Sequence, residues 1–297
     1  MSTFVLLTIT GLGLGAMYFL IASGLSLIYG LMGVLNFAHG AFLTVGSYAT
    51  WYAQVHLEGI GSVLVRFLVA ALVGLVAGAI VAALVELVLI RPLYQRHIQQ
   101  VLVTVGLALA ITALVAGIWG QDARVYALPE WTTDTTGILG ASVPNDRFVE
   151  IACAVVVLVG LQLFLRRTRY GLIIRAGVEN RAMVTALGID VRRAFTLVFA
   201  IGGLVAALAG ILSGIYFGTV DPERGTSLLI FAFIVVVIGG LGSISGSAVA
   251  GVVVGLVQQY ANYYASSGLG DLSVVLLLAV VLLVRPGGLS GLTARFA

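Results

Sequence analysis

Long apolar stretches separated by short polar connections run along most of this chain. A helix needs about 20 apolar residues to cross the hydrocarbon core of a bilayer. Six stretches come near that length, and we predict that each forms a membrane-spanning helix. They are Phe4–Tyr29, Val34–Val55, Ser62–Ile90, Val101–Trp119, Phe148–Leu165 and Ala194–Phe217.

The last third of the chain has shorter apolar stretches. Thr226–Ile238, Ser247–Tyr260 and Leu272–Val284 each fall short of a full span, and the Gly- and Ser-rich run Gly239–Gly246 divides the first two. Such a run is a poor continuous helix. We therefore predict an all-α fold, a polytopic helical transmembrane bundle with eight or nine crossings and discontinuous segments. Residues 1–297 are expected to form a single transmembrane domain.

Composition agrees with this pattern. Hydrophobic residues make up 61% of the 297 residues and charged residues only 9%, whereas an average globular chain has roughly 25% charged residues. A soluble fold of this size would lack the polar groups to cover its surface. We therefore expect an integral membrane protein, and soluble enzyme classes are nearly excluded.

Arginine placement predicts the orientation, because connections rich in basic residues stay in the cytoplasm. The connection over residues 166–194 carries seven arginines against two acidic residues, and Arg91 and Arg96 follow the third apolar stretch. Both regions are expected to be cytoplasmic. The loop Gly120–Arg147 carries four acidic residues against two arginines and is expected to face outward.

Small residues recur at four-residue spacing along several stretches. In lipid, this spacing lets helix backbones approach closely and pack by van der Waals contact. It predicts a tightly packed bundle, although glycine is also common in membrane helices generally. The sets are Gly11 and Gly15; Gly74, Gly78 and Ala82; Ala206, Gly210, Gly214 and Gly218; and Gly251 and Gly255.

Two interruptions of the apolar pattern mark where a solute path is predicted. In Gly30–Gly40, Asn36 and His39 are three residues apart and would share a helical face. Lipid satisfies neither an amide nor an imidazole, so both should point into the bundle or a wet cavity. In Gly239–Gly246, the exposed backbone groups need water, solute or protein partners.

Paired interruptions in the two halves of a sequence point to a transport site. The alternative is that Asn36 and His39 only hydrogen-bond a neighbouring helix and set its packing, and the residues leave both interpretations open. The predicted path residues are Asn36, His39, Gly40, Gly240, Gly242, Ser243, Ser245 and Gly246.

Glu86 is the carboxylate that the pattern places well inside a long predicted span. It lies five residues before Arg91, and pairing with that arginine or reaching the membrane interface is the ordinary explanation. A coupling-ion site is the alternative, but such a site should contain more than one carboxylate.

The arginine-rich connection is too long for a tight turn. Val178–Leu187 can form a short helix that stops at Gly188, a residue type typical of the position just after a helix. A short amphipathic helix of this kind docks in a groove on a soluble partner or lies flat on anionic lipid. The residue pattern does not separate these two roles.

Residues for catalysis are sparse. The chain has no lysine and no Gly-x-x-x-x-Gly-Lys-[Ser/Thr] motif, so it should not hydrolyse ATP at a Walker site of its own. Cys153 and three scattered histidines form no metal-binding pattern. The arginines lie in short connections and form no nucleic-acid footprint. We expect no enzymatic activity, no cofactor, no metal and no nucleic-acid partner.

Several blocks of this sequence, in order along nearly the whole chain, resemble the branched-chain amino acid ABC transporter permeases of the LivH type. The Asn-Phe-Ala-His-Gly block is the most specific of them, and the Gly/Ser block alone is weak. The blocks are Gly24–Gly30, Leu35–Gly40, Gly46–Tyr48, Arg91–Leu93, Arg175–Ile189, Gly239–Gly246 and Arg285–Leu289.

The resemblance implies one of two homologous permease subunits in an importer of the bacterial inner membrane. Two cytoplasmic ATP-binding subunits would bind beneath it, and a periplasmic solute-binding protein would deliver branched-chain or related amino acids. Residues 166–194 would then be the cytoplasmic coupling loop. Its expected ATPase-coupling residues are Arg175, Glu179, Arg181, Ala182 and Gly188. The alternative function is a self-sufficient secondary transporter or channel for a small polar solute, using His39 and Glu86 as ion-linked groups.

Overall fold

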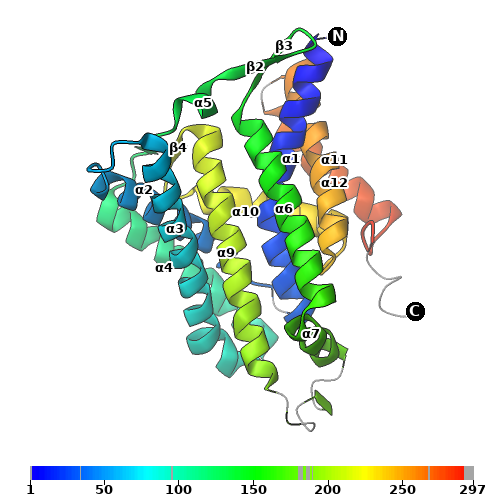
Figure 1. Cartoon of the computed structure of the whole chain (residues 1–297). Helices are drawn as coiled ribbons and strands as arrows, with labels where there is room; N and C mark the ends of the chain where they lie inside the picture. The colour runs from blue at the N-terminus through cyan, green and yellow to red at the C-terminus, as the bar shows by residue number, and fades with distance from the viewer. Residues whose placement is uncertain are drawn as a thin grey trace.

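The protein is seen in a computed structural model that describes residues 2–33, 35–94, 96–179, 183–184, 188, 190–266 and 268–290. These residues form a bundle of α-helices, which confirms the all-α membrane fold (Figure 1). The helices are α1 (Ser2–Met32), α2 (His39–His56), α3 (Val63–Val85), α4 (His97–Trp119), α5 (Glu130–Thr133), α6 (Asp146–Arg167), α7 (Arg169–Glu179), α9 (Val191–Phe217), α10 (Arg224–Gly239), α11 (Ile244–Tyr264) and α12 (Leu269–Val284).

Six of the helical segments in the described part of the chain are long and apolar enough to cross a membrane: Ser2–Gly30, Val63–Leu93, His97–Trp119, Asp146–Arg167, Val191–Phe217 and Ile244–Tyr264. Five of them match predicted spans. The sixth, α11, is longer than predicted, because residues 244–246 of the Gly/Ser run join its start and residues 261–264 continue it past Tyr260. The predicted span Val34–Val55 is instead the 18-residue α2, which begins only at His39. The total number of crossings stays a prediction.

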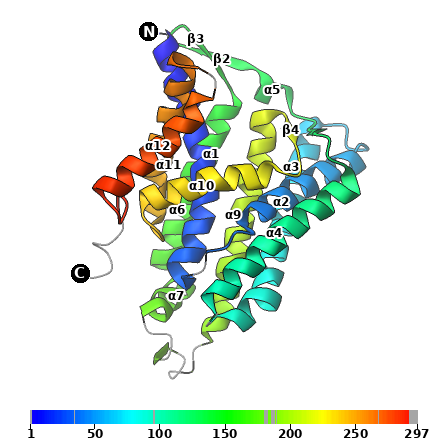
Figure 2. The same ribbon diagram turned by 180° about the vertical axis from the view of Figure 1, so that it is seen from behind.

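Helices α1 and α9 occupy the centre of the bundle. Helix α1 lies beside α6 and α11, and α9 lies beside α2 and α3. The 16-residue α10 crosses obliquely in front of these long helices and reaches from α2 to α11 (Figure 2). A short helix in this position connects the two sides of the bundle.

Most of the predicted small-residue spacings are packing seams. A Cβ added to Gly251 of α11 would lie 2.8 Å from the carbonyl oxygen of Gly15 in α1. A Cβ on Gly78 of α3 would lie 3.0 Å from the carbonyl oxygen of Gly203 in α9. Gly218 differs from its set, because its φ of 71° ends α9 and nothing lies within 4 Å of its Cβ position.

Two small antiparallel sheets lie at the end of the bundle that carries the N-terminus (Figure 1). Strand β1 (Arg124–Val125) pairs with β4 (Thr219–Val220), and β2 (Thr135–Ile138) pairs with β3 (Ala141–Pro144), with Ile138 opposite Ala141. Helix α7 lies at the opposite end of the bundle. The acidic loop and the arginine-rich connection are therefore separated by the length of the helices.

The end of the bundle that carries the β2–β3 hairpin, called the hairpin end below, is also held together by polar contacts. The Tyr126 hydroxyl donates to the carbonyl oxygen of Ser47 at 2.8 Å, and burial raises the pKa of this tyrosine. The side chain of Gln54 exchanges two hydrogen bonds with the backbone of Ala127. These bonds attach the loop to α2.

Candidate functional site

The first predicted interruption is a non-helical connection between α1 and α2. Gly33 has a φ of 65°, which glycine adopts without strain, and α1 ends at the residue before it. Residues 35–38 are not helical, and α2 starts at His39. Asn36 and His39 therefore do not share a helical face, and that expectation was wrong because the backbone leaves the helix at Gly33.

Asn36 is buried and lies in this connection. Its Oδ1 accepts a hydrogen bond from the backbone N–H of Ala38 at 3.1 Å. Its Nδ2 is buried without a protein partner. A buried amide nitrogen without a partner is uncommon, because buried donors are usually hydrogen-bonded.

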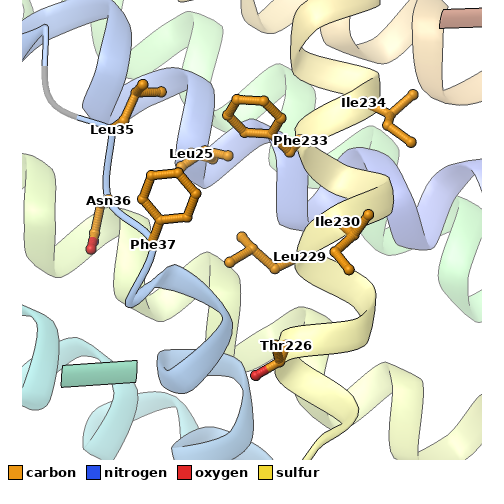
Figure 3. Close-up of a pocket in the computed structure, with 9 residues that line it drawn as sticks. All are labelled: Leu25, Leu35, Asn36, Phe37, Thr226, Leu229, Ile230, Phe233 and Ile234. Atoms are coloured by element: carbon orange, nitrogen blue, oxygen red, sulfur yellow. The ribbon is translucent and has the colours of Figure 1, made fainter. Parts of the chain in front are cut away.

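A cavity of about 250 Å³ lies between this connection and α10. Its lining is almost entirely hydrocarbon, with Asn36 and Thr226 as the polar residues (Figure 3). The rings of Phe37 and Phe233 stack with their centroids 6.2 Å apart. The lining residues are Leu25, Leu35, Asn36, Phe37, Thr226, Leu229, Ile230, Phe233 and Ile234.

His39 is not among the residues that line this cavity. It is fully buried, and its Nε2 donates to the carbonyl oxygen of Ile21 in α1 at 3.1 Å. A Cβ on Gly24 would lie 2.7 Å from the imidazole Cε1, so α1 leaves room for the ring only with a glycine here. Gly40, the next residue, lies against the backbone of Gly225 at the start of α10.

The second predicted interruption is the tight turn between α10 and α11. Gly240 and Gly242 have φ values of 98° and 83°, which other residues rarely adopt. Ser243 caps α11, because its Oγ accepts from the N–H of Gly246 at 3.0 Å. Ser245 is exposed, and Gly246 packs on the backbone of Gly239.

The C-terminal segment satisfies part of the backbone of this turn. The N–H of Leu289 donates to Ile238 at 2.8 Å, and the N–H of Ser290 donates to Gly239 at 3.2 Å. The Ser290 hydroxyl also contacts Ser243 Oγ at 2.7 Å. The sequence left water, solute or protein open as partners for the backbone of this run. For Ile238 and Gly239, the partner is protein.

The two interruptions meet in space. A Cβ on Gly30 of α1 would lie 2.8 Å from both Cα and the carbonyl oxygen of Gly242. One turn earlier, the hydroxyls of Ser26 and Ser247 are hydrogen-bonded at 2.7 Å in a buried position. The end of α1 thus packs closely against the α10–α11 turn and the start of α11, beside the cavity.

Glu86, which directly follows the last residue of α3, is the centre of a second polar site. It begins the π-helical segment Glu86–Ile90, and its carboxylate is fully buried. Arg91 pairs with it at 3.3 Å, which confirms the predicted pairing. Thr196 of α9 donates to it at 2.6 Å, and the Tyr94 hydroxyl also donates to it.

A further buried charged cluster escaped the sequence analysis. Arg147 forms ion pairs with Asp146 at 3.1 Å and with Glu150 at 3.4 Å, and its guanidinium lies 3.4 Å from the ring centre of Tyr216 in α9. Its signal was the spacing of the two acidic residues, which places them on one face of α6. Within the described residues, no three His, Cys, Asp or Glu side chains gather to hold a metal ion.

Three of the predicted coupling residues, Arg175, Glu179 and Gly188, belong to the described part of the chain. Arg175 is exposed on α7, Glu179 is the last residue of that helix, and Gly188 is exposed with a φ of 79°. Arg181 and Ala182 lie outside the described residues. The predicted helix Val178–Leu187 mostly lies outside them too, and the helix seen here begins earlier, at Arg169.

Comparison with known proteins identifies the family. The sequence model of the family described as "Branched-chain amino acid transport system / permease component" matches residues 7–285. The chain belongs to this family. The permease is also 32% identical over 291 residues to the high-affinity branched-chain amino acid transport system permease protein LivH of Salmonella typhimurium, with 95% of this chain and 93% of the relative covered.

Two further relatives differ in the substrate that their names give. BraD of Pseudomonas aeruginosa, also named a high-affinity branched-chain amino acid permease, is 30% identical over 95% of this chain and 94% of its own. The fructose import permease FruF of Bifidobacterium longum is 32% identical over 84% of this chain and 69% of its own. No solved structure matches the chain. The protein is thus a multi-pass membrane permease of a transport family.

Proposed function

We propose that the permease is the membrane subunit of an ABC importer that moves branched-chain or related amino acids into the cytoplasm of a bacterium. The observation that carries this proposal is its similarity, over nearly its whole length, to permeases named for that transport. ATP hydrolysis in partner subunits supplies the energy, which agrees with the absence of a Walker motif from the sequence.

The assembly contains a second homologous permease subunit in the lipid bilayer, two ATP-binding subunits in the cytoplasm and a periplasmic solute-binding protein. The exposed arginines around α7 support a cytoplasmic position for that end in the inner membrane. The acidic loop with the β2–β3 hairpin then faces the binding protein. The arm over residues 166–194, with Arg175, Glu179, Arg181, Ala182 and Gly188, contacts an ATP-binding subunit.

The cavity beside Asn36 supports an apolar side chain as the group that is recognised. Polar groups are costly to bury without hydrogen-bond partners, and this applies to the hydroxyls of a sugar as well as to the charged amino and carboxylate groups of an amino acid. Asn36 and Thr226 supply few such partners, whereas Leu229, Ile230 and Phe233 match a branched hydrocarbon. Of the predicted path residues, Asn36 is therefore the one we place in contact with solute.

Uptake into vesicles tests this function. The permease is reconstituted with its second permease, ATP-binding and solute-binding subunits, and radiolabelled leucine uptake is measured with ATP and with a non-hydrolysable analogue. We expect uptake only with ATP, and inhibition by excess isoleucine or valine but not by fructose. Concentrative uptake by the isolated permease would instead establish the secondary-transporter alternative, and ATP-dependent uptake of fructose would overturn the substrate.

A charge reversal tests the contact of the arm. Arg181→Glu is expected to reduce co-purification of the ATP-binding subunits, because a contact residue of the arm would change sign. Arg285→Glu is a matched control at an exposed arginine that follows α12. Equal co-purification of wild type and Arg181→Glu would contradict this contact.

A further inference from the structure

We propose that a hydrogen-bonded relay, centred on Glu86, transmits movement of the cytoplasmic arm to the wall of the solute cavity. This inference rests on the proposed ATP-driven function, because it assigns the residues that carry the motion. It concerns positioning residues, none of which has to touch the solute.

The first step connects the arm to Tyr94. Val184 of the arm is buried and forms a small apolar cluster with Val191 and Phe195 at the start of α9. Tyr94 packs against this cluster, with its ring edge-on to Phe195 at 5.8 Å. Displacement of the arm therefore acts directly on Tyr94 and on the first turn of α9.

The second step converges on one buried carboxylate. Tyr94 donates to Glu86 Oε1, and Thr196 of α9 donates to Oε2 at 2.6 Å. Arg91 contacts Oε2 at 3.3 Å and donates to the Thr196 hydroxyl at 2.8 Å. Glu86 thus ties α9, the end of α3 and the turn after it to a single group. Hydrogen bonds to a charged, buried group are strong, so these segments are held in one arrangement.

The third step leads from that turn to the cavity. Arg91 and Leu93 belong to the same short 3₁₀ helix, Arg91–Leu93. The carbonyl oxygen of Leu93 accepts from Gln100 Nε2 in α4 at 2.6 Å. One turn further along α4, Thr104 Oγ1 accepts from the backbone N–H of Phe37 at 3.3 Å. Phe37 is a wall of the cavity and adjoins Asn36.

The burial of the polar side chains along this route supports a functional role for them. Glu86, Gln100 and Thr104 are almost fully buried, although they lie in segments that are otherwise strongly apolar. Polar residues are expensive inside a membrane bundle. A π-helical segment such as Glu86–Ile90 is also frequent at functional sites. Hydrogen bonds, the turn Arg91–Leu93 and one turn of the α4 backbone between Gln100 and Thr104 together link Tyr94 to the cavity wall. Coupling between the two ends is measured with the variants below.

The test uses conservative variants in the full reconstituted importer. Tyr94→Phe keeps the ring but removes the hydroxyl, and Thr104→Val keeps the shape but removes the acceptor for Phe37. Each is expected to retain assembly and ATP hydrolysis while lowering the solute imported per ATP by at least roughly fivefold. Tyr263→Phe and Thr133→Val are the matched controls, at exposed positions near the hairpin end.

The double variant separates a relay from two local defects. If both residues act in one route, Tyr94→Phe with Thr104→Val should lower the ratio of solute to ATP no further than the worse single variant. A ratio equal to wild type in both single variants, or fully multiplicative losses in the double variant, would overturn the relay. Failure of the proposed function is distinguishable, because the wild-type complex would then show no ATP-dependent uptake.

Discussion

Gly30 of α1 and Gly242 of the α10–α11 turn lie in direct backbone contact, and each leaves no room for a Cβ on the other. This contact joins the two interruptions of the apolar pattern, which are more than 200 residues apart in the chain. Small residues are required here because helix association in lipid depends on close van der Waals packing.

Gly30→Ala is expected to destabilise the permease. The added methyl would lie 2.8 Å from the backbone of Gly242, which has little freedom to move. Overpacking of this kind costs about 1–3 kcal/mol, which thermal unfolding of the purified permease would report. Gly160→Ala in α6 is the control, since nothing lies within 4 Å of its Cβ position. Equal melting temperatures for wild type and Gly30→Ala would refute this packing.

His39→Gln is expected to leave the pH dependence of transport unchanged. The ring is buried and its Nε2 donates to Ile21, a bond that the glutamine amide can replace. The expected loss of stability is therefore below about 1 kcal/mol, the typical worth of one hydrogen bond. The measurement compares initial uptake rates of wild type and His39→Gln from about pH 6 to about pH 8, the range in which an ordinary histidine titrates. A lost inflection near neutral pH would support a proton-linked role instead.

Arg147→Met is expected to destabilise the permease strongly. It leaves Asp146 and Glu150 buried without their cation, and breaking a buried pair costs about 3–5 kcal/mol. Adding Glu150→Gln should restore part of the loss. Chemical denaturation of the three proteins measures this coupling. Arg193→Met is the control, because its ion pair with Asp190 is exposed and contributes about 1 kcal/mol or less.

Ile230→Trp is expected to block the cavity. Ile230 lines the cavity although it is 60% exposed, so the larger ring would narrow the opening of the cavity. This should lower ATP-dependent leucine uptake at least roughly tenfold, as loss of a methylene-sized fit already costs about that much. Expression and assembly should stay unchanged. Ile118→Trp at an exposed site of α4 controls for added bulk. Wild-type uptake by Ile230→Trp would remove the cavity from the solute path.

Cysteine labelling tests the orientation of the bundle. In a Cys153→Ser background, Ser142→Cys lies on the β2–β3 hairpin and Arg169→Cys lies at the start of α7, both at exposed positions. A membrane-impermeant maleimide applied to intact spheroplasts should label the first and spare the second. The reverse result would place the arm outside the cytoplasm and contradict the proposed ATPase contact.

Sequence reasoning located the long helices well and the irregular segments poorly. Five spans were predicted because length and hydropathy are local properties of a stretch of chain. The start of α2 was missed, since Gly33 ends α1 through a positive φ that one sequence does not reveal. Glu150 was overlooked because it lies at the very beginning of an apolar stretch, three residues after Arg147.

The sequence by itself determined the membrane environment, most of the helices and the separation of acidic and basic connections, and it offered the pairing of Glu86 with Arg91 as one ordinary explanation. All of these depend on residues that are close together along the chain. Only the tertiary structure decided that Gly30 contacts Gly242. It also decided that His39 packs against α1, whereas Asn36 lines a cavity. The hydrogen bond from Thr196 to the Glu86 carboxylate likewise depends on the fold. Those relationships depend on how helices distant in sequence cross, which is set by packing over the whole bundle.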